Sequence, residues 1–125
     1  MRIQQAASDV FVLSTLSEFE TLNTFKLRVF RKEITSTMAD RSRVLFEHDI
    51  RNDVFELHLL PQSVFTQARK LSEKWSAQLG TRAFDIVHVA AALDLGALSF
   101  FSFDLNQRKL AHAAGLKLCP MPKKP

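Results

Sequence analysis

The stretch TRAFDIVHVAAALDLGALSFFSFD, residues 81–104, decides the predicted fold. Its Ala-rich apolar part predicts a helix over 82–95, and LSFFSF predicts a strand over 98–103 that is buried on both faces. Asp85 and Asp104 stand at the edges of these two apolar segments. Because an unpaired ionised carboxylate is costly to bury, each is expected to be paired, neutralised or bound to a metal.

Helical and extended patterns alternate through the rest of the chain. The predicted strands cover 9–13, 54–59 and 116–119, and the predicted helices cover 15–31, 36–50, 61–79 and 105–114. Helices that separate strands favour an α/β fold, a parallel sheet with helices packed on both faces. Ligands of such sheets bind beyond the C-terminal ends of the strands, which makes Asp104 a candidate site residue.

Size and composition are those of one globular domain. The 125 residues are enough for a real core, so we predict a single domain over 1–119 and a disordered tail over the Pro- and Lys-containing residues 120–125. The sequence has no apolar run of about 18 residues and no signal-peptide core, so no membrane association is expected. Cys119 is the single cysteine, which fits a reducing cytoplasmic location.

The chain is basic, with a formal net charge of +4. Lys and Arg drive binding to polyanions by neutralising phosphates, so RNA is a candidate partner. An ordinary basic protein without such a partner has the same charge.

The carboxylates allow two interpretations. Asp85 falls in the first turn of its helix, where it meets the helix dipole, and Asp104 is placed to cap the next helix. Alternatively, both join a third acid from the helix over 15–31, which offers Glu18 and Glu20, in a site for Mg²⁺ or Mn²⁺. His88, three residues after Asp85, is expected to be a packed, hydrogen-bonded core histidine rather than a ligand.

The segment TRAFDIVHVAAALDLGALSFFSFDLNQRKLAHAAGLKL resembles the C-terminal half of a PIN domain, the nuclease fold of VapC-type toxins. The segment SEFETLNTFKLRVFRKEI resembles the glutamate helix of that family. The resemblance implies a metal-dependent endoribonuclease that uses Mg²⁺ or Mn²⁺. By the same resemblance Glu20, Asp85 and Asp104 are the catalytic and metal-binding acids, and Lys26, Arg28, Arg31 and Arg82 hold RNA.

The chain also departs from the family. PIN domains open with a central strand that carries an aspartate, and Asp9 stands in the wrong place to be that residue. We therefore expect an N-terminally truncated, PIN-like three-layer fold with a mostly parallel sheet. Strands left without their central partner invite pairing with another chain, which predicts a homodimer.

Three interpretations of the acids follow from these patterns. The first is a ribonuclease toxin of a toxin-antitoxin system, with an antitoxin protein as partner. The second is a catalytically inactive PIN remnant that binds RNA or protein. In the third, the acids only cap helices.

Overall fold

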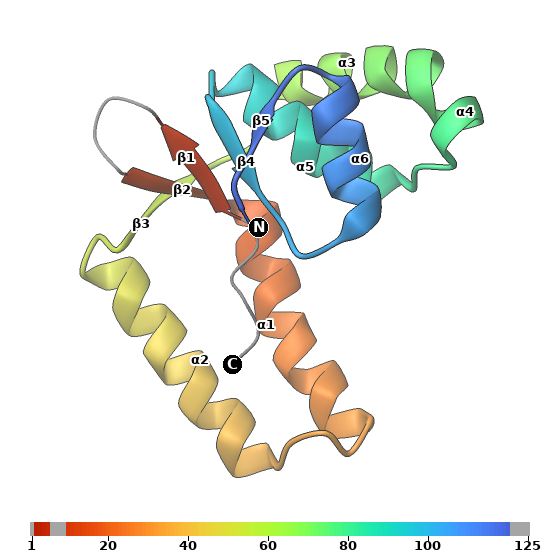
Figure 1. Ribbon diagram of the computed structural model, residues 1–125. Helices are drawn as coiled ribbons and strands as arrows, with labels where there is room; N and C mark the ends of the chain where they lie inside the picture. Colours follow the sequence, from red (N-terminus) through yellow and green to blue (C-terminus); the bar gives the residue numbers. More distant parts are fainter. Residues whose placement is uncertain (1, 6–9, 121–125) are drawn as a thin grey trace.

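The computed structural model describes residues 2–5 and 10–120, with residues 2–5 and Val10 described by their backbone alone. Asp9 and most of the predicted tail, residues 121–125, lie outside the described residues. The fold is α/β (Figure 1), as predicted. Its strands are β1 (Arg2–Gln5), β2 (Val10–Ser14), β3 (Phe55–His58), β4 (Ser99–Phe101) and β5 (Lys117–Leu118). Its helices are α1 (Thr15–Phe30), α2 (Ser36–Arg51), α3 (Gln62–Leu71), α4 (Ala77–Leu79), α5 (Ala83–Asp94) and α6 (Leu105–Ala113), with a π-helical turn at Ser72–Ser76 between α3 and α4.

The five strands form one sheet in the order β3-β2-β1-β4-β5. β2 pairs with β3, and β4 with β5, in parallel. β1 lies in the centre and is antiparallel to both of its neighbours, so four strands run one way and β1 runs the other. Only residues 6–9 separate β1 from β2, and so short a connection permits an antiparallel pair but not a parallel one.

β1 was not predicted, and it corrects one expectation. Its sequence RIQQ offers one apolar residue among polar ones, which is too little for a strand pattern. The main chain of β1 pairs with both β2 and β4, so the expectation that these strands lack a central partner is wrong. The prediction of a homodimer loses its original reason with it.

The Ala-rich helix α5, predicted over 82–95, lies at the centre of the core. Ala90, Ala91 and Ala92 are fully buried, and small side chains let a helix approach its neighbours closely. α5 packs on α3 and α6. The hydrophobic core around it includes the buried Phe100 of β4 and Leu110 of α6. Figure 1 shows α3, α5 and α6 gathered on one side of the molecule.

β4 is shorter than predicted, and it is not buried on both faces. Phe100 is fully buried, but Leu98 and Phe103 at the ends of the predicted strand are exposed. The strand ends early because Ser102 turns the chain: its Oγ accepts a hydrogen bond from the backbone N–H of Asp104 at 3.0 Å. The turn brings Phe103 and Asp104 to the sheet edge instead of into the core.

Helices α1 and α2 form a pair that extends away from the other helices (Figure 1). Each begins at a side-chain cap, because Ser14 Oγ accepts from the N–H of Ser17 and Thr35 Oγ1 accepts from the N–H of Met38. Both helices follow their predicted ranges closely. No helix in the described part of the chain has the length and apolar character needed to cross a bilayer.

Candidate functional site

A cleft of about 710 Å³ opens where β2 and β4 end. Glu20 reaches it from α1, Asp85 from the first turn of α5, and Asp104 from the loop between β4 and α6. The three acids that the sequence singled out therefore line one cavity, whereas Glu18 is not part of its lining. The remaining lining residues are Thr21, Thr24, Phe25, Arg82, Ala83, Phe84, Phe103 and Gln107.

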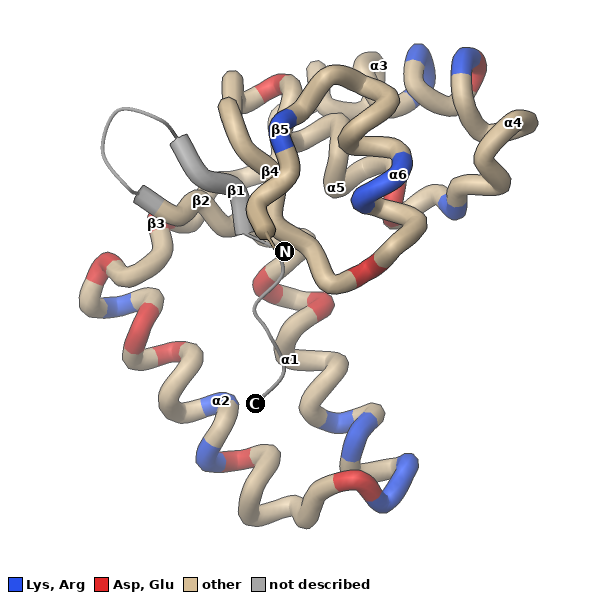
Figure 2. Tube along the Cα trace, in the orientation of Figure 1, with Lys and Arg blue, Asp and Glu red and all other residues tan. Residues whose placement is uncertain are grey.

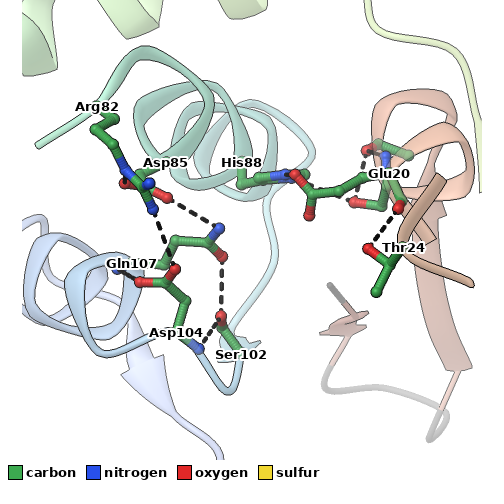
Figure 3. Close-up of polar contacts among 10 residues, drawn as sticks. Glu20, Thr24, Arg82, Asp85, His88, Ser102, Asp104 and Gln107 are labelled. Atoms are coloured by element: carbon green, nitrogen blue, oxygen red, sulfur yellow. Dashed lines mark hydrogen bonds and ion pairs between the residues drawn. The ribbon is translucent and has the colours of Figure 1, made fainter. Parts of the chain in front are cut away.

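Asp85 is the buried acid of the site, with 3 % of its surface exposed. Arg82 Nε lies 3.3 Å from its Oδ2, and Gln107 donates from Nε2 to its Oδ1 at 3.2 Å. The Oε1 of Gln107 in turn accepts from Ser102 Oγ at 2.9 Å. Both carboxylate oxygens are thus satisfied, and the side chain is held in one orientation (Figure 3).

Asp104 has the capping role that its position predicts, and a second contact as well. Its Oδ1 accepts from the backbone N–H groups of Asn106 and Gln107, at 2.8 and 3.2 Å, which starts α6. Its Oδ2 lies 3.6 Å from Arg82 Nη2. One guanidinium therefore lies between the carboxylates of Asp85 and Asp104, as Figure 3 shows.

Glu20 is held by a chain of polar side chains that includes the fully buried His88. Nε2 of His88 lies 3.1 Å from Glu20 Oε2, and Nδ1 lies 3.2 Å from Ser17 Oγ. Because an ionised carboxylate only accepts hydrogen bonds, the Nε2–H of His88 is the donor to Glu20, and on the other side of the ring Ser14 Oγ donates to Ser17 Oγ at 3.0 Å. The prediction that His88 is a hydrogen-bonded core residue is confirmed.

The hydrogen bond from His88 lowers the pKa of Glu20 below its ordinary value of 4.5. Partial burial opposes this shift, and the hydrogen bond outweighs it because it favours the charged form of the carboxyl group. Glu20 is therefore ionised at neutral pH, and the cleft carries its negative charge opposite Arg82.

The carboxylate oxygens of the cleft are the kind of ligand that Mg²⁺ and Mn²⁺ prefer. The positive charge of Arg82 already balances two of the carboxylates, since its guanidinium lies between Asp85 and Asp104. Within residues 10–120, no group of three or more His, Cys, Asp or Glu side chains is arranged to hold a metal ion. The Arg82 side chain is 72 % exposed, so solvent competes with the two carboxylates for its guanidinium.

The basic residues predicted to hold RNA divide into two groups. Arg82 lies in the cleft. Lys26, Arg28 and Arg31 follow the outer half of α1 toward its junction with α2, where Figure 2 shows several basic residues together. Two of them have acidic neighbours: Lys26 Nζ is 3.9 Å from Asp40, and Arg28 Nε is 3.2 Å from Glu33.

Sequence reasoning missed two residues that shape the site. Gln107 is buried and connects Asp85 to Ser102, and Ser17 is fully buried against His88. The spacing gave one usable signal, because Gln107 stands three positions after the cap Asp104, where its backbone N–H donates to the cap carboxylate.

The sequence matches no protein-family model, and it matches no curated protein.

Proposed function

We propose that this protein is a PIN-like, metal-dependent endoribonuclease, a toxin of a toxin-antitoxin system, with Mg²⁺ or Mn²⁺ at Glu20, Asp85 and Asp104. The observation that carries the proposal is the meeting of these three acids, from separate elements, in one cleft at the ends of β2 and β4. Carboxylates gathered at this edge of an α/β sheet are a usual way to bind a catalytic divalent ion.

The resemblance of the acid-bearing segments to a PIN domain adds to this proposal. The central strand of that family belongs to a parallel sheet, whereas the central strand here, β1, is antiparallel to both of its neighbours. The three-layer PIN arrangement, the antitoxin partner and a homodimer belong to the same proposal. A homodimer now rests on exposed apolar residues of α2, among them Val44 and Leu45.

The residues of the cleft have distinct tasks in this proposal. A bound divalent ion supplies charge stabilisation for hydrolysis of the phosphodiester. Asp85, Asp104 and Glu20 would hold the ion through their carboxylate oxygens. Arg82, displaced from the two aspartates, contacts an RNA phosphate. Gln107 and His88 keep the carboxylates in place through the hydrogen bonds described above.

The test is RNA cleavage by the purified protein in Mn²⁺. Asp85→Asn and Asp104→Asn keep the side-chain shape and remove the charge, and each is expected to abolish most of the cleavage. Asp94→Asn is the matched control, because Asp94 lies on the same helix as Asp85 but outside the cleft, where it accepts a hydrogen bond from Ser63. Cleavage that survives both cleft substitutions contradicts the proposal.

A second candidate is an RNA-binding module without catalysis. The specific observation in its favour is β1, whose sequence RIQQ places no carboxylate in the centre of the sheet, where the PIN family has one. A site short of one acid binds a divalent ion more weakly. RNA binding without any cleavage in Mn²⁺ would favour this candidate over the nuclease.

A further inference from the structure

Each of the three cleft acids directly follows an exposed phenylalanine. The pairs are Phe19–Glu20, Phe84–Asp85 and Phe103–Asp104, and the rings are 65 %, 64 % and 67 % exposed. An aromatic ring carries a large apolar surface, so three exposed rings beside one polar cleft are unusual for a surface that contacts only water.

The rings belong to the cleft and not merely to its neighbourhood. Phe84 and Phe103 line the same cavity as Asp85, Asp104 and Arg82. Phe84 also lines an adjoining cavity of about 240 Å³, together with Phe19 and Glu20. Phe84 therefore lines both cavities, while Phe103 lines only the first and Phe19 only the second.

Rigid elements hold the two central rings. Phe84 is in the first turn of α5, one residue before the buried Asp85, so the helix that positions the acid also positions the backbone that carries the ring. Phe103 packs edge-on against Phe101 of β4, with ring centroids 5.0 Å apart and planes at 86°. Rings that are already fixed lose little conformational entropy when a flat ligand covers them.

The charge of the cleft limits what can cover these rings. Without a metal, three carboxylates face one arginine and the cleft repels a polyanion; a bound divalent ion brings the formal charge only to about zero, so affinity for RNA there gains from a contribution that does not depend on charge. A nucleobase is neutral and has a flat π-face for the ring and polar edges for neighbours such as Arg82 and Thr24. An apolar peptide side chain would instead cover the charged groups without offering them hydrogen bonds.

We propose that Phe84 and Phe103 form a stacking platform for an unpaired nucleobase, which Phe19 extends toward α1. The proposal rests on the nuclease function above and deepens it, because it names the contact that holds the RNA strand beside the acids. Base–aromatic stacking tolerates every base, so the platform selects an unstacked, single-stranded segment and not a particular sequence.

The test measures binding of a short fluorescent, phosphorothioate-linked single strand, which resists hydrolysis, in Mn²⁺ buffer. Phe84→Leu and Phe103→Leu keep an apolar side chain and remove the ring, and each should weaken Kd roughly 5- to 100-fold. The slope of log Kd against log salt should not change, because no charge is lost. Phe84→Trp should retain the binding.

Phe65→Leu is the matched control, since Phe65 is 55 % exposed on α3 and outside the acidic cleft. Unchanged binding in both Phe→Leu variants overturns the platform, as does Phe84→Trp binding as weakly as Phe84→Leu. Loss of a dimer in sedimentation for Phe84→Leu also overturns it, because the ring is then an interface between copies.

The outcomes separate this inference from the proposed function. Metal-dependent cleavage that needs Asp85, combined with ring-independent binding, removes the platform and leaves the nuclease. Ring-dependent binding without cleavage in Mn²⁺ supports the platform and removes the nuclease.

Discussion

The Nε2 of the fully buried His88 lies 3.1 Å from Oε2 of Glu20, so a histidine of α5 holds the carboxylate of α1 at the cleft. These residues are far apart in the sequence, and their contact joins the helical pair α1–α2 to the core. The same imidazole is held on its other side by Ser17. Two predictions follow from this contact.

His88→Ala should destabilise the protein by about 2–4 kcal/mol, because it leaves a cavity and removes the hydrogen-bond partner of the buried Ser17 hydroxyl. Urea unfolding followed by circular dichroism measures the change. His112→Ala is the control, since His112 lies in the last turn of α6 and is exposed. Equal stability of the two variants would contradict the role given to His88.

Glu20 should make stability depend on pH in the acid range. Its pKa is lowered in the folded protein from 4.5 by the hydrogen bond from His88, so the unfolded chain binds the proton more readily. The stability from this group is present above pH 4.5 and is lost as the pH falls through the lower, folded pKa. Unfolding free energies of wild type and Glu20→Gln, measured in metal-free buffer, should differ above pH 4.5 and converge below it. A difference that is independent of pH would contradict the assignment.

Arg82→Gln should have opposite effects on two ligands. The guanidinium competes with any cation for Asp85 and Asp104, and because exposed ion pairs are weak, its loss should tighten Mn²⁺ binding only about 2- to 5-fold. Binding of single-stranded RNA should weaken, and its salt slope should fall by about 0.7, as for one lost phosphate contact. Calorimetry with Mn²⁺ and fluorescence anisotropy with RNA measure the two effects.

Arg69→Gln is the control for Arg82, because Arg69 is a highly exposed arginine of α3 whose partner is Glu73. It should change neither measurement. Weaker Mn²⁺ binding in Arg82→Gln would mean that Arg82 supports the metal site instead of competing with it.

The periodic elements of this fold could be predicted from the sequence, and the central strand could not. The helices α5 and α1 carry strong local signals, because α5 is apolar around most of its circumference and α1 begins at a serine cap. β1 carries no such pattern: its four residues are held in place by main-chain pairing with β2 and β4, and main-chain hydrogen bonds leave little trace in side-chain type.

The acids of the site were predictable, but their partners were not. Asp85 and Asp104 stand out because charged residues border apolar segments. Gln107 does not stand out, since a glutamine in a helix is ordinarily a surface residue, and its burial depends on how α6 meets α5. The arginine between the aspartates is likewise a product of tertiary packing, because Arg82 and Asp104 come from separate elements.

Arg31→Gln should weaken RNA binding more than Arg28→Gln. Arg31 is the C-cap residue of α1, eleven residues after Glu20, and continuing the rotation and rise of the helix places it about 20° away and roughly 16 Å farther along the same side. Arg28 is turned about 80° from Glu20, and Glu33 lies 3.2 Å from its Nε and already offsets its charge. For an RNA strand that leaves the cleft along α1, Arg31 is therefore the first basic side chain whose charge is available to a phosphate. The salt slope of binding should fall by about 0.7 for Arg31→Gln and by less for Arg28→Gln. Equal slopes for wild type and Arg31→Gln would mean that the strand leaves the cleft in another direction.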